Sequence, residues 1–126
     1  MDLRPGLATR VQLTVTDADT AQSLGSGDVP VLGTPRALAL AEAATVALTA
    51  GRLPAGATTV GVRVELEHLA ATPVGGLVVA EAVISEVDGR RLSFVVTLRQ
   101  GEQVAARIQV ERVIVDRETF VAKAYS

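Results

Sequence analysis

The sequence predicts an α+β fold in which an antiparallel sheet covers one long helix, and three observations support this. Residues 34–50 form an apolar segment with helix start and stop signals. Four later segments alternate apolar and other residues with the two-residue period of strands. Short turn signals such as Asp88-Gly89 join these strands, which favours hairpins and an antiparallel sheet. The apolar helix then needs the apolar face of that sheet as its cover.

The first third of the chain predicts a strand, a loop and the helix. In residues 9–16 (TRVQLTVT) apolar and polar residues alternate, as in a half-buried strand. Residues 17–33 are rich in Asp, Ser, Gly and Pro, which predicts a long loop. Thr34 followed by Pro35 is typical of a helix start, with Thr34 as the N-cap. Gly51 should end the helix.

The remaining residues predict four strands, at 58–68, 77–87, 91–99 and 103–115. In the first of them, strict alternation places Val60, Val62, Val64, Leu66 and His68 on one face. Gly61 then lies on the opposite face, with Arg63, Glu65 and Glu67. Residues 120–125 are too short a segment to assign. We expect a single domain spanning residues 1–126.

Composition excludes several classes of function. Aromatic residues make up only 2% of the 126 residues and the net charge is −2, which argues against a nucleic-acid partner. The chain has no cysteine and one histidine, so we expect no metal site. The N-terminus does not resemble a signal peptide, and no apolar run is long enough to span a bilayer. We therefore expect a cytoplasmic protein that does not contact membranes.

One acid inside the apolar helix is the first candidate for chemistry. After Arg36, Glu42 is the only charged residue of residues 34–50. A carboxylate in a buried helix must find a partner or serve a reaction. A structural ion pair with Arg63 or Arg112 is the alternative to catalysis. Thr34 lies about two turns before Glu42 on the same helix face, which makes it either a second functional residue or only the N-cap.

Two residues of the strand at 58–68 are further candidates. His68 is the only histidine, and it serves either acid–base chemistry or an ordinary structural hydrogen bond. Gly61 inside a strand marks either a β-bulge or a close approach of the backbone to a ligand. The sequence leaves both alternatives open at both positions.

Three segments carry a resemblance to a known family. They are LGTPRALALAE at residues 32–42, GVRVELEHLAATP at residues 61–73, and VDGRRLSF at residues 87–94. With them the chain resembles the hot-dog-fold thioesterases, and among these the fluoroacetyl-CoA thioesterase type. The resemblance implies a hot-dog fold, with an antiparallel sheet of about five strands wrapped around one long central helix. It also implies an acyl-CoA thioesterase.

The resemblance places the family's catalytic residues on Thr34, Glu42 and His68, and the glycine beside its site on Gly61. Glu42 would attack the thioester carbonyl or activate a water, and His68 would assist the water or protonate the leaving thiolate. Thr34 would orient Glu42 or, with the Gly61 N–H, donate to the developing oxyanion.

Partners follow from the same resemblance. Coenzyme A enters as part of the substrate and no separate cofactor is expected. The open edge strand of a hot-dog sheet predicts a homodimer, which could assemble further into a tetramer. Arg90, Arg91 and Arg112 are candidates for binding the CoA phosphates, or are ordinary solvated arginines.

One segment departs from the family pattern. The fluoroacetyl-CoA enzymes carry phenylalanines ahead of the catalytic threonine, whereas residues 23–33 (SLGSGDVPVLG) contain no aromatic residue. We therefore expect a small or medium acyl group other than fluoroacetyl. A non-catalytic acyl-CoA-binding dimer and an enoyl-CoA hydratase-like activity are the alternatives.

Overall fold

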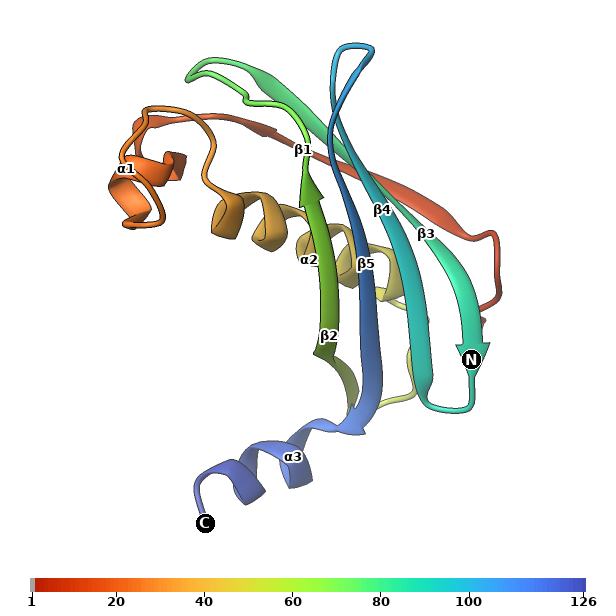
Figure 1. Cartoon of the computed structure of the whole chain (residues 1–126). Helices are drawn as coiled ribbons and strands as arrows, with labels where there is room; N and C mark the ends of the chain where they lie inside the picture. The colour runs from red at the N-terminus through yellow and green to blue at the C-terminus, as the bar shows by residue number, and fades with distance from the viewer. Residues whose placement is uncertain (1) are drawn as a thin grey trace.

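The computed structural model describes residues 2–126 as one sheet with helices at both of its ends (Figure 1). The strands are β1 (Ala8–Thr14), β2 (Ala57–His68), β3 (Leu77–Asp88), β4 (Arg91–Gln100) and β5 (Gln103–Asp116). The helical segments are the 3₁₀ turn η1 (Asp17–Asp19), α1 (Ala21–Leu24), α2 (Thr34–Thr49) and α3 (Arg117–Ala124). These bounds confirm the predicted strands and long helix to within a few residues.

The sheet is antiparallel, with the strand order β1-β3-β4-β5-β2. It curves around α2, which contacts all five strands, while α1 and α3 lie near opposite ends of the sheet (Figure 1). This arrangement confirms the α+β prediction of a five-stranded sheet wrapped around one long helix. Residues 120–125, left unassigned above, belong mostly to α3.

The core lies between one face of α2 and the concave face of the sheet. Ala37, Ala41 and Ala44 of α2 are fully buried, and β3 contributes the buried Ala80 and Ala82 opposite them. Small side chains on both sides let the helix axis approach the sheet closely. Larger residues, among them Phe94, Val96 and Leu98 of β4, fill the space beside the helix. The backbone of α2 is therefore held firmly against the sheet.

A β-bulge in β2 corrects the predicted alternation. Gly61 is paired with Arg112 and Arg63 with Glu111, so the extra residue Val62 shifts the register. A bulge reverses which residues face each side of a sheet. The prediction that Gly61 and His68 lie on opposite faces was therefore wrong, because Gly61 now faces α2 together with His68.

The segment before α2 also differs from its prediction. Residues 17–33 are not a plain loop, because they contain η1 and α1. The N-cap of α2 is Gly33, and Thr34 is already helical. Thr34 was therefore wrongly predicted as the N-cap. Its hydroxyl makes no capping bond and is free for another contact.

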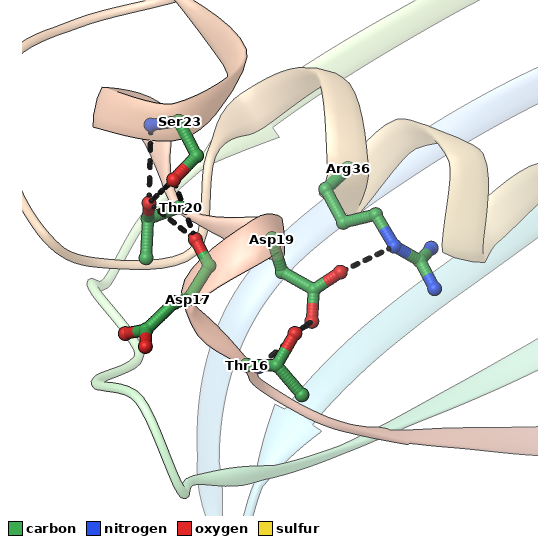
Figure 2. Close-up of polar contacts among 6 residues, drawn as sticks. All are labelled: Thr16, Asp17, Asp19, Thr20, Ser23 and Arg36. Atoms are coloured by element: carbon green, nitrogen blue, oxygen red, sulfur yellow. Dashed lines mark hydrogen bonds and ion pairs between the residues drawn. The ribbon is translucent and has the colours of Figure 1, made fainter.

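Asp19 connects this segment to the start of α2 (Figure 2). Its carboxylate accepts hydrogen bonds from the Thr16 N–H at 2.8 Å and the Thr16 hydroxyl at 2.9 Å. The other carboxylate oxygen accepts from Arg36 Nε at 3.0 Å. Burial alone would raise the pKa of Asp19, but the hydrogen bonds from Thr16 and Arg36 and the Arg36 charge outweigh it and leave the pKa lowered. The folded chain therefore holds Asp19 as a carboxylate.

Replacement of Asp19 by Asn should destabilise the fold in a pH-dependent way. At pH 7 we expect a loss of about 1–3 kcal/mol in the free energy of unfolding, because charge-assisted hydrogen bonds are weakened. The pKa is lower in the folded than in the unfolded chain, where it is near 3.8. The carboxylate's contribution is thus complete above that value and is lost as the pH falls through the folded value.

Urea unfolding of both proteins between pH 7 and pH 2 measures this difference. The wild-type advantage should shrink below about pH 4. The matched control is Glu81→Gln, which removes the exposed ion pair of Glu81 with Arg10 and should cost about 0.2–1 kcal/mol. A difference between wild type and Asp19→Asn that stays constant over this pH range contradicts the prediction.

Candidate active site

Thr34 and His68 meet at the end of the sheet where β2 ends. The Thr34 hydroxyl and His68 Nδ1 are 2.8 Å apart, within hydrogen-bonding distance. Thr34 comes from the first turn of α2 and His68 from the last position of β2, 34 residues later in the chain. Because α2 begins here, its N-terminal N–H groups also favour negative charge at this point.

The second ring nitrogen of His68 has no partner among residues 2–126. Nε2 is buried and accepts or donates no hydrogen bond within the described chain. Buried polar atoms without a hydrogen-bond partner are rare in proteins, and a catalytic role is one explanation for those that occur. Since Nδ1 is engaged by Thr34, Nε2 is the ring nitrogen that remains without a protein partner.

A cavity of about 390 Å³ opens beside these two side chains. Ser26, Thr34 and His68 contribute its polar side chains, and most of its remaining wall is aliphatic. The apolar residues come from the segment before α2 and from the loop after β2: Ala21, Val29, Val31, Leu32, Leu69, Ala70 and Ala71. Pockets of this kind, apolar with a few convergent polar groups, are typical binding sites for small ligands.

Glu42 forms an ion pair with Arg112 of β5. Arg112 NH1 donates to Glu42 Oε2 at 3.0 Å. The other guanidinium nitrogens donate to Thr59, with Nε at 2.9 Å from its hydroxyl and NH2 at 3.1 Å from its carbonyl oxygen. Arg112 is thus fully engaged with the protein, and its side chain is only 8% exposed. This burial does not support the prediction that Arg112 binds CoA phosphates.

Glu42 itself is less buried than the sequence predicted. Its side chain is 36% exposed, because the sheet covers only one side of α2. Among residues 2–126, Arg112 is the one group that donates to its carboxylate, and it bonds to Oε2. Oε1 therefore stays available to a substrate or a water.

Gly61 lies directly against the Glu42 carboxylate. A Cβ atom at this position would sit 2.7 Å from Glu42 Oε2 and 3.4 Å from Arg112 NH1. The first distance is shorter than any ordinary contact, so only glycine lets the carboxylate approach the strand here. Both alternatives predicted for Gly61, a β-bulge and a close approach, therefore occur. The group that approaches the backbone is the Glu42 side chain and not a ligand.

The structure therefore brings four of the predicted residues to the same side of the sheet, in two contacting groups. Thr34 contacts His68, and Glu42 is adjacent to Gly61. Within residues 2–126, no hydrogen bond connects Glu42 to Thr34 or to His68. The shared helix face of Thr34 and Glu42 places the two groups about two turns apart along α2.

The remaining predicted residues, Arg90 and Arg91, lie elsewhere. Both are exposed, and both are at the turn between β3 and β4, near the end of the sheet where β2 begins. Arg91 is paired with Glu111 at 2.8 Å. The chain does not bring either of them to Thr34 or His68, and their role in binding CoA stays a prediction.

Two further findings concern the described residues 2–126. They contain no group of three or more His, Cys, Asp or Glu side chains placed to hold a metal ion. No helix in this part of the chain is long and apolar enough to cross a membrane.

Sequence reasoning missed Thr59 and Asp19. Thr59 carries no pattern of its own, but Arg112 alternates with Val110 and Ile114 on the apolar face of β5, which signals a buried partner network. Asp19 could have been found from the Thr-x-x-Asp spacing with Thr16, which is typical of a capped helical turn.

Comparison with solved structures shows which proteins share this fold. The fluoroacetyl-CoA thioesterase FlK superimposes with a TM-score of 0.92 at 29% identity, covering 99% of this chain and 97% of that one. A hot-dog-like protein from Thermanaerovibrio acidaminovorans gives 0.90 at 23% identity, with 99% and 96% covered. A Thermus thermophilus protein described as a thioesterase superfamily member gives 0.91 at 23% identity, with 99% and 93% covered.

The sequence comparisons identify the family. No curated protein sequence matches the chain. The family model for FlK, the fluoroacetyl-CoA-specific thioesterase, matches residues 15–118, which include α2, the bulge of β2 and every residue of the candidate site. The solved structures above have the same hot-dog fold. This chain therefore belongs to the FlK family of thioesterases.

Proposed function

We propose that the chain hydrolyses acyl-CoA thioesters with a small or medium aliphatic acyl group, using Thr34, Glu42 and His68. The observation that carries the proposal is the 2.8 Å contact between Thr34 and His68 at the wall of an aliphatic cavity, on the same side of the sheet as Glu42. Membership of a thioesterase family supports thioester hydrolysis as the reaction.

Glu42 supplies the attacking group or its base. Arg112 holds Oε2, which leaves Oε1 to act on the reactants. In one route Oε1 attacks the thioester carbon, the C–S bond breaks, and water then hydrolyses the mixed anhydride. In the other route Oε1 takes a proton from a water that attacks the same carbon. Both routes give a carboxylic acid and free CoA.

His68 donates the proton to the leaving group, and Thr34 orients the His68 ring. His68 Nε2 lacks a protein partner, which suits it to protonate the departing thiolate. The Thr34 hydroxyl fixes the ring through Nδ1. The Gly61 N–H, which lies beside Glu42, is proposed to stabilise the oxyanion that forms on the carbonyl oxygen.

The cavity wall favours an aliphatic acyl group over fluoroacetyl. Ala, Val and Leu side chains form most of it, and no aromatic residue occurs in residues 23–33. We propose selectivity for acyl chains longer than acetyl.

Glu42→Gln and His68→Ala should each abolish most of the activity. We expect rates of CoA release to fall about 10²–10⁴-fold, because each variant removes an acid–base group. A thiol-release assay over acetyl-, butyryl-, hexanoyl- and crotonyl-CoA measures this loss and the acyl preference.

Glu81→Gln is the matched control, because it makes the same chemical change at an exposed ion pair and should leave the rate unchanged. Full rates in both site variants contradict the mechanism. Saturable acyl-CoA binding without turnover by the wild type supports a binding module, and loss of crotonyl-CoA without thiol release supports hydration.

Gly61→Ala should reduce kcat without loss of folding. The added methyl group must displace the Glu42 carboxylate from its place beside Arg112. A misplacement near 1 Å costs about 10²-fold in rate. Steady-state kinetics and circular dichroism together measure both effects, and a wild-type kcat in a folded variant contradicts the positioning of Glu42 by Gly61.

The exposed edge of the sheet supports a homodimer as the active form. β2 is an edge strand of 12 residues, and edges of this length are normally paired or covered. Val62 and Val64 of β2 are 50% and 40% exposed, and Val46 of α2 is 48% exposed. A second copy paired along β2 would cover these valines and the open side of Glu42, which places the site at the interface.

Val64→Lys should shift the protein toward monomers, because it places a charge in the proposed interface. Sedimentation velocity at several concentrations measures the shift. The matched control is Val95→Lys, since Val95 is 42% exposed on the central strand β4 and should not affect assembly. A wild-type protein that is monomeric at all concentrations contradicts the proposal.

A further inference from the structure

Asp19 holds the first turn of α2 on both sides of Thr34. Its backbone carbonyl accepts from the N–H of Gly33 at 2.9 Å, immediately before Thr34. Its carboxylate accepts from Arg36 Nε at 3.0 Å, two residues after Thr34. Figure 2 shows the carboxylate between Thr16 and Arg36. One residue thus fixes the helix start from two directions.

Asp19 is in turn attached to the sheet. Its second carboxylate oxygen accepts from the N–H and hydroxyl of Thr16. The preceding residue, Val15, is buried and pairs with the loop before β3 through the Gly75 N–H at 2.8 Å and the Gly76 carbonyl oxygen at 2.9 Å. The side chain of Asp19 is only 12% exposed. These contacts therefore fix the position of the first turn of α2 relative to the sheet that carries His68.

The contacts around Gly33 leave little freedom for any other arrangement. A Cβ atom at Gly33 would lie 3.0 Å from the backbone nitrogen of Ala21, so α1 and α2 touch at this point. The Leu32 N–H donates to the Thr72 carbonyl oxygen at 2.9 Å. The N–H groups of Leu32 and Gly33 are thus both bonded outside α2, which holds the two residues that precede Thr34.

We propose that Asp19 is a positioning residue that sets the distance between the Thr34 hydroxyl and His68 Nδ1. The proposal rests on the proposed function, because it gives that distance a catalytic purpose. Asp19 does not line the cavity and is not a catalytic residue. It acts through the placement of Thr34, whose own hydroxyl makes no capping bond that could hold the turn.

The single histidine allows a test that does not depend on turnover. With ¹⁵N-labelled protein, the imidazole resonances belong to His68 alone, and the Nδ1 shift reports its hydrogen bond with Thr34. Thr34→Val gives the reference position for a lost bond. In Asp19→Ala we expect the Nδ1 resonance to move toward that position, and in Asp19→Asn to move part of the way.

Arg36→Gln keeps the test decisive if Asp19→Ala does not fold, because it removes only the hydrogen bond from Arg36 to the Asp19 carboxylate and changes a partly exposed side chain. It should give a smaller movement in the same direction. Glu81→Gln should leave the resonance in place. A wild-type Nδ1 position in the folded Asp19 and Arg36 variants overturns the proposal, whether or not the protein is a thioesterase.

Kinetics separate positioning from a general loss of stability. Below the unfolding temperature, Asp19→Ala should lower kcat for butyryl-CoA about 10- to 10²-fold, with KM changed less than about twofold. Asp19→Asn should recover part of kcat. If the Nδ1 resonance moves while no variant, nor the wild type, releases thiol, the positioning role stands and the proposed function fails. A raised KM with unchanged kcat overturns the positioning role.

Discussion

The ion pair between Glu42 and Arg112 is the interaction on which the candidate site depends. It can form only because β2 carries a bulge after Gly61, which turns that glycine toward α2 and leaves room for the carboxylate. Arg112 is held in turn by Thr59, so hydrogen bonds connect Glu42 of α2 to β5 and β2. An uncompensated charge would be costly at this place, and the pair removes that cost while it holds the Glu42 carboxylate beside Gly61. Glu42 thus becomes an oriented group, and orientation is what a general base or a nucleophile requires.

The strands, the long helix and the candidate site residues could be predicted from the sequence. Period-two segments and turn signals predicted all of the strands after α2, since the apolar face of a meander must repeat every second residue. Glu42 stood out because it interrupts an apolar helix, and Arg112 was named as a partner for it. The side of the sheet taken by Gly61 could not be predicted from alternation, because a single inserted residue, Val62, reverses it and leaves no periodic signal.

Other differences arise from contacts across the fold. Thr34 before Pro35 is typical of an N-cap, yet Gly33 takes that position, since Asp19 and α1 hold it in place and His68 engages the Thr34 hydroxyl. Local propensity could not reveal a partner 34 residues away. Glu42 was expected to be buried because α2 is apolar nearly all round. In the chain alone it is half-buried, because the sheet covers only one side of α2.

One measurement tests the central claim most directly. A crystal structure with the amide analogue of butyryl-CoA, in which nitrogen replaces the thioester sulfur, fixes where the acyl carbonyl binds. The account predicts the carbonyl carbon within reach of Glu42 Oε1, its oxygen facing Gly61, and the alkyl chain extending toward the cavity beside Thr34 and His68. An analogue bound at the opposite end of α2, or with its carbonyl away from Glu42 and His68, contradicts the account.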